Sequence, residues 1–306
     1  MFKEINFDIP LFAGYLHKIK TSLVNKDVLV NKDSRIVFTC GAAEPKDFAK
    51  TGRSLLMKYA SNHLKNYNFF MAEKLFNVMG NNKNDLLSIE KQLTNYSDCI
   101  IIILESPSSF AELGAFSVDD ELAKKMIVIN DYQFRNEESF INLGPIRKVN
   151  EKSIFGQCVS IDFERIAQSF SQLEKVLDEK IKSQRNKEIE VNSYSKLISN
   201  KKERFYLVHD LISLFFPLTH GELIQIFKTL YGDNNAYQIH FDIALLRSLG
   251  FIDLVDNHYT KSPYSKDLFL TSFGFSYRAI RIDLINFYRK FDSRLNVLIP
   301  DDAKAA

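Results

Sequence analysis

The segment Cys99-Ile-Ile-Ile-Ile-Leu104 restricts the fold more than any other part of the sequence. It is a short, uninterrupted apolar run rich in β-branched residues, which is typical of a strand buried on both faces. Strands of this kind occur in parallel sheets that carry helices on both sides. The run therefore predicts an α/β domain with this strand near the middle of the sheet.

Helix-like and strand-like segments alternate on both sides of this run. Three other short apolar segments have the composition of strands: Arg35–Cys40, Asn68–Met71 and Met126–Ile129. The alternation predicts a Rossmann-like parallel sheet flanked by helices over residues 35–160. Because ligands bind beyond the carboxyl ends of parallel strands, we expect the loops after Cys40, Leu104 and Ile129 to share one rim.

The rest of the chain has a different pattern. Residues 1–34 are interpreted as an N-terminal extension, and the charged, polar residues 161–204 as a helical linker. From residue 205 to 306, three helices are followed by a β-hairpin and a closing helix, and Thr219 and Glu222 have capping-box spacing. This order predicts a C-terminal, mainly helical winged-helix domain.

Composition restricts the class of protein. A formal net charge of +2 over 306 residues argues against a surface devoted entirely to nucleic acid, but it permits a local basic face. The three cysteines and the histidines lack metal-ligand spacing, so we expect free thiols, histidines on helix surfaces or at caps, and no metal site. No stretch approaches the roughly 20 apolar residues that cross a bilayer. These features predict a cytoplasmic protein without membrane contact.

Glu112 is the first candidate for a catalytic group. It lies four residues past Ser108, in or near the first turn of the helix that follows the central strand. Helix amides there should keep the carboxylate ionised. An ionised carboxylate is what a nucleophile or an electrostatic partner needs against an oxocarbenium-like sugar centre. On position alone, a solvated glutamate that merely complements the helix dipole is the commoner case.

Small and hydroxyl-bearing residues surround Glu112 in the sequence. Ser106, Ser108 and Ser109 could bind sugar hydroxyls or phosphate oxygens of a ligand in the same loop. Gly114 has no side chain and would let a ligand or another backbone approach closely.

The segment Ser106-Pro-Ser-Ser-Phe-Ala-Glu-Leu-Gly-Ala-Phe-Ser117 resembles the catalytic segment of the nucleoside 2-deoxyribosyltransferase-like family. In that family the glutamate of a Phe-x-Glu-Leu-Gly-like motif attacks the anomeric carbon. The similarity is closer still to the branch found as effectors of retron anti-phage systems. Three further segments agree with that branch in the expected order: Phe38–Gly41, Leu86–Glu90 and Phe140–Arg147. The resemblance covers residues 35–150, and the second half fits the same branch.

The resemblance implies roles for individual residues. It makes Glu112 the nucleophile, and it places Gly41 and Ala42 in a loop that passes under the base or phosphate. Glu90 corresponds to an acid that contacts the leaving base, although that acid is usually Asp. Asn142 is a weaker candidate for a ligand contact, since an Asn that caps a turn before Gly-Pro explains it equally well.

Ser106 departs from the family pattern, because deoxyribosyltransferases usually carry Asp at this position. A site without that acid should handle neutral bases poorly. Nicotinamide departs neutral from a cationic ring and needs no general acid. The substitution is thus compatible with cleavage of NAD+, the substrate that the retron branch is implicated in consuming.

The resemblance also implies partners. It predicts contact with a retron reverse transcriptase and its RNA-linked DNA (msDNA), and an oligomeric assembly, because family members share sites between subunits. Five basic residues in or beyond the helical region could contact nucleic acid or a protein partner: Arg247, Lys261, Lys266, Arg278 and Arg281. A winged helix that binds protein is as well supported as one that binds duplex DNA.

The leading hypothesis is an N-glycosidase toxin that takes NAD+ as substrate, needs no cofactor, and is controlled by its retron partners. One alternative is a nucleoside or nucleotide 2-deoxyribosyltransferase or hydrolase. Another, from a different class, is a winged-helix DNA-binding regulator whose first half only senses a nucleotide.

Overall fold

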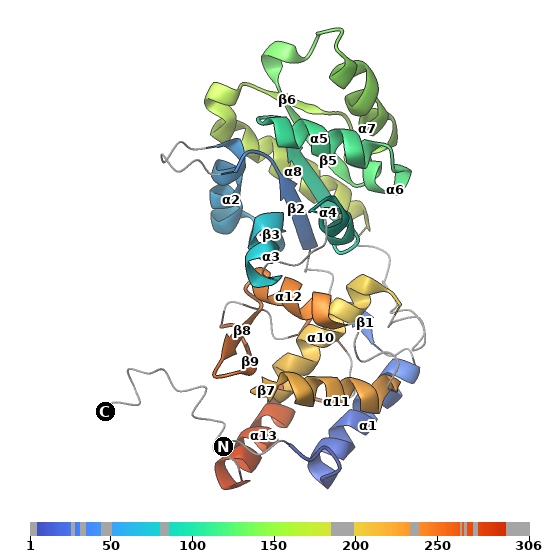
Figure 1. The fold of residues 1–306 in the computed structure, drawn as a ribbon, viewed down its shortest axis with the longest axis vertical. Helices are drawn as coiled ribbons and strands as arrows, with labels where there is room; N and C mark the ends of the chain where they lie inside the picture. The colour runs from blue at the N-terminus through green and yellow to red at the C-terminus, as the bar shows by residue number, and fades with distance from the viewer. Residues whose placement is uncertain are drawn as a thin grey trace, which may run out of the picture. The chain divides into compact units, whose positions relative to one another are not determined.

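The computed structural model divides the chain into two compact units, whose elements are labelled in Figure 1. The α/β unit comprises Lys32–Phe76 and Gly80–Lys187, and the helical unit comprises Met1–Asn31, Asn77–Met79 and Glu188–Ala306. The structure describes residues 5–25, 28–30, 35–43, 51–79, 86–184, 199–232, 239–263, 265, 268–271 and 275–291.

A five-stranded parallel sheet forms the centre of the α/β unit, as the sequence predicted. In sheet order its strands are β3 (Tyr67–Phe70), β2 (Arg35–Cys40), β4 (Cys99–Ile103), β5 (Met126–Asp131) and β6 (Val159–Ile161). Every residue of β4 is buried, which explains its unbroken apolar sequence. Strand β3 lies on one side of β2, whereas β4, β5 and β6 lie on the other side. The strand order therefore changes direction between β2 and β4, and parallel sheets bind ligands in the crevice at such a point.

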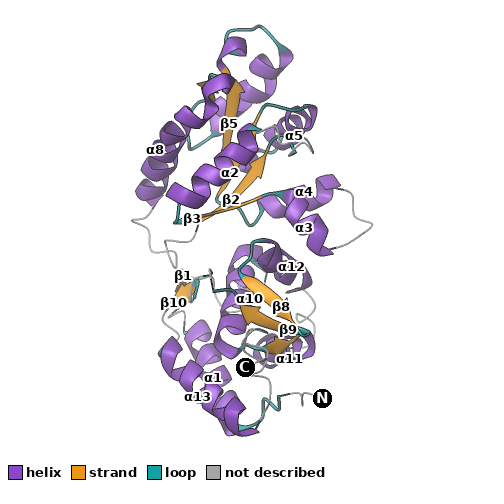
Figure 2. Cartoon of the chain, turned by 90° about the vertical axis from the view of Figure 1, so that its left-hand side faces the viewer, coloured by secondary structure: helices purple, strands orange, loops and turns teal. Residues whose placement is uncertain are grey.

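Helices cover both faces of this sheet (Figure 2). The helices of the unit are α2 (Gly52–His63), α3 (Ala72–Met79), α4 (Leu86–Thr94), α5 (Pro107–Ser117), α6 (Asp120–Ala123), α7 (Arg147–Lys152) and α8 (Ile166–Gln184). Val37 of β2 packs in one cluster with residues of α2 and α8. Phe38 points to the other face and contacts Phe116 of α5. Because strand residues alternate, Cys40 shares the face of Phe38 and α5.

The α/β unit extends beyond residue 160, where the sequence analysis ended it. Phe170, Leu173 and Leu177 of α8 are buried against the sheet in the same cluster as Val37. A helix rich in charges was interpreted as part of a linker, but its apolar stripe completes the core.

The helical unit contains a three-stranded antiparallel sheet in the order β7-β9-β8. Its elements from residue 201 are α10 (Lys201–Phe215), β7 (Leu218–Thr219), α11 (His220–Tyr231), α12 (His240–Ser248), β8 (Ile252–Val255), β9 (His258–Lys261), β10 (Leu270–Thr271) and α13 (Tyr277–Phe291). Asp256 and Asn257 both have positive φ, as a two-residue hairpin turn requires. The winged-helix interpretation is based on this order of three helices followed by a hairpin. The interpretation stays a prediction.

The N-terminal segment belongs to the helical unit rather than standing apart as an extension. Its elements are α1 (Pro10–Val24) and β1 (Leu29–Val30). The backbone N–H of Ile5 donates to Glu222 Oε1 at 2.7 Å, and β1 pairs with β10. Strand β10 therefore pairs with the N-terminal segment and not with the hairpin formed by β8 and β9. Among the described residues, no helix has both the length and the apolar character needed to span a membrane.

His209 and Asp210 form a fully buried network in α10, which corrects the expectation that the histidines lie on helix surfaces or at caps. Asp210 accepts hydrogen bonds from the backbone N–H groups of Phe269 and Leu270 at 2.8 and 2.7 Å. His209 lies 2.8 Å from both Asp210 Oδ1 and Ser265 Oγ. This network ties the segment before α13 to α10.

Asp210→Ala is expected to reduce the free energy of unfolding of the helical unit by about 3 kcal/mol, because it leaves buried N–H groups without acceptors. Ser265→Ala removes one hydrogen bond and should cost about 1 kcal/mol. Denaturation of the full chain, followed by hydrogen exchange at Phe269 and Leu270, measures both effects. Equal stability of the two variants would contradict this account of Asp210.

Candidate active site

The serines after β4 define the start of α5. Ser106 is the N-cap residue, and its Oγ accepts a hydrogen bond from Ser109 N at 3.3 Å. Ser109 is buried and its Oγ donates to the carbonyl of Ser106 at 2.7 Å. Ser108 is exposed, with its Oγ 2.9 Å from Ser106 Oγ. The hydroxyl of Ser109 thus serves the helix cap, whereas Ser108 is the serine most open to a ligand.

Glu112 lies in the second turn of α5, six residues past its N-cap, and not in the first turn. Burial, followed by the negative charge of Glu90, raises the pKa of Glu112 to about 7. The helix dipole does not hold this carboxyl firmly ionised, because its influence fades beyond the first turn. The buried thiol of Cys40 lowers the pKa of Glu112 against the effects of burial and Glu90, as does the charge of Arg53. Glu112 Oε2 is buried without a hydrogen-bond partner among the described residues.

Glu90 on α4 is a second acidic residue close enough to act on Glu112. Burial, and next the charge of Glu73, raise the pKa of Glu90 to about 7. The charge of Glu90 in turn acts on Glu112. The structure therefore brings together two carboxyls that share their titration range and oppose each other's ionisation.

Arg53 is a residue of the site that the sequence analysis missed. It lies near the start of α2, is buried, and its Nη2 donates to Glu73 Oε1 at 2.7 Å. Its positive charge lowers the pKa of Cys40, Glu90 and Glu112 against the larger effect of burial. Arginine in a helical segment is usually solvent-exposed. Nothing in the sequence therefore indicated that Arg53 is buried beside the carboxyl groups.

Glu105 also has a role that the sequence did not indicate. Its carboxylate accepts hydrogen bonds from the backbone N–H groups of Ala42, Gly52 and Arg53, at 3.0, 2.6 and 2.9 Å. A Cβ atom on Gly41 would come within 2.8 Å of Glu105 Oε1, which explains why glycine occupies this position. Glu105 thus fixes the backbone after β2, and the amide of Ala42 binds protein rather than a ligand.

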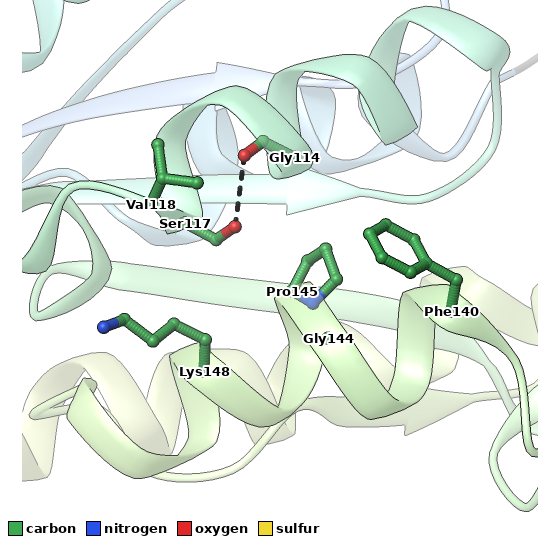
Figure 3. Close-up of a pocket in the computed structure, with 7 residues that line it drawn as sticks. All are labelled: Gly114, Ser117, Val118, Phe140, Gly144, Pro145 and Lys148. Carbon is green, nitrogen blue, oxygen red and sulfur yellow. Dashed lines mark hydrogen bonds between the residues drawn. The ribbon is translucent and has the colours of Figure 1, made fainter.

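A pocket of about 410 Å³ lies on the other side of α5 (Figure 3). It is lined by Gly114, Ser117, Val118, Phe140, Gly144, Pro145 and Lys148. Gly114 follows Glu112 by two residues, which turns it about 200° around the helix axis. The open space beside Gly114 is therefore separate from the carboxylates, and its predicted role in the site around Glu112 finds no support in this placement.

Asn142 begins the π-helical turn η2 (Asn142–Ile146) beside α5. Its Nδ2 donates to the carbonyls of Phe134 and Glu137, both at 2.8 Å. The amide nitrogen therefore supports the preceding loop. It does not cap a turn before Gly144 and Pro145, because both residues lie inside η2.

The basic residues of the helical unit differ sharply in what they can contact. Arg281 is buried, donates to the carbonyls of Leu214 and Phe216, and stacks on the Phe216 ring 3.5 Å away. The prediction that Arg281 contacts phosphate is therefore wrong, because its guanidinium serves the C-terminal end of α10. Arg278 is exposed.

Of the remaining basic candidates, Arg247 lies on α12 and Lys261 on β9. Arg247 and Lys261 are partly exposed, and Lys266 lies outside the described residues. Asp242 on α12 is fully buried and pairs with Arg204 at 2.5 Å. Its negative charge is therefore not presented on the surface. Within the described part of the chain, no group of His, Cys, Asp and Glu side chains could hold a metal ion.

Fold and site together define an α/β protein with two half-buried carboxyls near the switch point of a parallel sheet, joined to a helical unit. Residues 49–254 match the family described as STM3845 retron effector protein. The chain belongs to this family of retron effectors.

Two relatives from Escherichia coli are similar over most of the chain. The first, named "Retron Ec73 putative ribosyltransferase/DNA-binding protein", is 31% identical over 266 residues, covering 81% of this chain and 80% of the relative. The Ec86 relative, whose name carries the same functional words, is 34% identical over 210 residues, covering 65% of this chain and 66% of the relative.

Proposed function

We propose that this retron effector is a nucleoside deoxyribosyltransferase-like N-glycosidase that cleaves the bond between nicotinamide and ribose in NAD+. The observation that carries the proposal is Glu112 Oε2, a buried carboxylate oxygen left without a partner at the ligand-binding edge of the sheet. The word ribosyltransferase in the names of both relatives supports chemistry at a ribose C1′.

In the proposed reaction, the C1′–N bond breaks and its electron pair neutralises the pyridinium nitrogen, so nicotinamide leaves without a proton. Glu112 stabilises or captures the electron-poor C1′ centre. Water then adds its oxygen to C1′ and loses a proton to the Glu112 carboxylate or to solvent. The products are nicotinamide and ADP-ribose.

The charges of the site favour a cationic substrate. Its described residues place three carboxyl groups, Glu73, Glu90 and Glu112, around the single guanidinium of Arg53. A pyridinium ring entering this site would relieve the repulsion between the carboxylates, which adds to burial in raising the pKa values of Glu90 and Glu112. A neutral base gives no such relief and would instead need a protonated carboxyl as general acid.

Nucleoside deoxyribosyl transfer remains the second candidate, because a pKa of about 7 lets Glu90 carry the proton that a neutral base requires. In this reaction a second base, rather than water, attacks C1′.

The dependence of kcat/KM on pH separates the two reactions. Cleavage of NAD+ needs ionised carboxylates, so its rate should rise with pH through about 7 and then level off. Transfer from a neutral base needs protonated Glu90, so its rate should fall above about 7. Profiles from about pH 5 to 9 with each substrate test this, and an NAD+ rate that falls at alkaline pH would contradict the proposed mechanism.

We further propose that the helical unit docks the effector onto its retron partners, a reverse transcriptase and msDNA, in an oligomeric anti-phage assembly. Three of the basic candidates lie at the surface of the described residues: Arg247 and Lys261, which are partly exposed, and Arg278, which is exposed. The words DNA-binding in the relatives' names support this assignment.

A further inference from the structure

The pocket beside Gly114 lies in the α/β unit, on the side of α5 away from Glu112. Its volume of about 410 Å³ falls within the range of about 300–1,000 Å³ that is typical of small-molecule sites. The C-terminal half of α5 forms one wall, and the segment from Phe140 through η2 to the start of α7 forms the other (Figure 3). Phe140 and Lys148 lie at opposite ends of this second wall, with Pro145 between them. The pocket thus has an aromatic end and a cationic end.

Two glycines in the walls of the pocket are not required by packing among the described residues. Gly114 lies inside α5, where glycine is less favourable than alanine. Beyond its own helix, a Cβ atom on Gly114 would meet no atom within 4 Å, and one on Gly144 would meet the Phe140 ring at an ordinary 3.7 Å. Gly144 also belongs to the π-helical turn η2, and such turns are frequent at functional sites. The missing side chains therefore keep space open beside a surface that a ligand can approach.

Phe140 provides the aromatic end of the pocket. Its side chain is 80% exposed, and the neighbouring Val118, which also lines the pocket, is 79% exposed. Large apolar side chains that are exposed together, rather than singly, mark binding sites. An aromatic ring that is open to solvent binds another planar ring by stacking. This end of the pocket is therefore suited to a planar, aromatic part of a ligand.

Lys148 provides the cationic end together with Lys152. Asp120 lies between them, with Oδ1 2.6 Å from Lys148 Nζ and Oδ2 3.1 Å from Lys152 Nζ. Two ammonium groups share one carboxylate, so one positive charge is in excess, and all three side chains are partly exposed. The other charged groups of α6 and α7 form one-to-one pairs: Glu121 with Lys124 and Arg147 with Glu151. The excess charge at Lys148 is thus suited to an anionic group such as phosphate.

We propose that this pocket is a nucleotide-binding site, separate from the active site, that takes a free mononucleotide. The base stacks on Phe140, the sugar lies against Gly114 and Pro145, and the phosphate is bound by Lys148. A planar base and a phosphate at the two ends of one small molecule match the two ends of the pocket. Because the pocket and the carboxylates lie on different sides of α5, this inference does not rest on the cleavage of NAD+.

The test titrates the full chain with AMP and with adenosine and follows the methyl NMR signals of Val118, which are assigned by their loss in Val118→Ala. AMP should shift these signals. Phe140→Ala should weaken AMP binding at least about tenfold, because the base loses its stacking partner. Lys148→Met should weaken AMP binding about tenfold but adenosine binding less than about twofold, because adenosine has no phosphate. Lys124→Met is the matched control, a lysine that pairs with Glu121 outside the pocket, and should bind AMP as the parent does.

Gly114→Leu is the blocking variant, and it should fold because leucine favours helices and its side chain enters open space. It should abolish the AMP-induced shifts of Val118 while the melting temperature holds or rises. Glu112→Gln, on the other side of α5, should leave the affinity for AMP unchanged. AMP binding that persists in Gly114→Leu and is lost in Glu112→Gln would place the nucleotide at the carboxylates and overturn the inference. A parent protein that does not bind AMP, but self-associates through a contact that Phe140→Ala abolishes, would overturn it in favour of a second copy of the chain.

Discussion

Glu112→Gln is expected to reduce NAD+ cleavage at least about a thousandfold, because the amide can neither capture C1′ nor stabilise its positive charge. The variant should fold, since glutamine has the same shape and its neutral group suits a half-buried site. Nicotinamide release by the full chain with its retron partners measures the loss. Glu121→Gln, an exposed glutamate on α6, is the matched control and should retain the parent rate.

Glu112→Gln should also change the free energy of unfolding, and the raised pKa of Glu112 determines the sign of that change. The folded protein raises the pKa of Glu112 to about 7, so ionising this group opposes folding as pH rises from about 4.5 to 7. Glu112→Gln should therefore stabilise the protein at alkaline pH, by about 1 kcal/mol after allowance for solvent screening, and have little effect at acidic pH. Wild-type activity combined with an unchanged melting temperature in this variant would contradict the assignment of Glu112.

Arg53→Met is expected to have the second-largest effect, a loss of about 100-fold in kcat/KM at pH 7. The charge of Arg53 lowers the pKa of both Glu90 and Glu112. Without it, both carboxyls should titrate at least about one unit higher, which leaves about a tenth of Glu112 ionised at neutral pH. The rest of the loss in kcat/KM follows because the variant lacks the 2.7 Å hydrogen bond from Arg53 to Glu73, which leaves the carboxyl groups less well positioned.

Part of this loss should return as pH rises, because alkaline solution ionises the carboxyls again. Arg53→Lys keeps the charge and should shift the profile much less. Arg35→Met is the matched control, since Arg35 is another buried arginine of this unit but pairs with Asp98 at 3.6 Å. A loss in Arg53→Met that is the same at every pH would show that Arg53 acts only through structure.

The sheet could be predicted because burial on both faces leaves an unmistakable pattern in a strand such as Cys99–Ile103. Strand β6, Val159–Ile161, was missed because three residues with a central serine do not form a run. Helix α8 was interpreted as part of a linker because its many charges hide the apolar stripe that packs on the sheet. The spacing of apolar residues identifies a helix or a strand more readily than it identifies the elements against which that helix or strand packs.

The site was only partly predictable for a related reason. The motif identified Glu112 and Glu90, yet their pKa values depend on burial and on each other. Arg53 acts through a contact with Glu73, which is 20 residues away in the sequence, and no local pattern reports such a contact. Arg281 shows the reverse case, a basic residue whose charge is used inside the protein.

The central claim is that this effector breaks the nicotinamide–ribose bond of NAD+ through Glu112. The most direct measurement incubates the full chain with NAD+ and deoxynucleosides together, with and without the proposed partners, a reverse transcriptase and msDNA. All products are followed by mass spectrometry. We predict equal amounts of nicotinamide and ADP-ribose, and neither product from Glu112→Gln. Base exchange among the deoxynucleosides while NAD+ stays intact would contradict the claim.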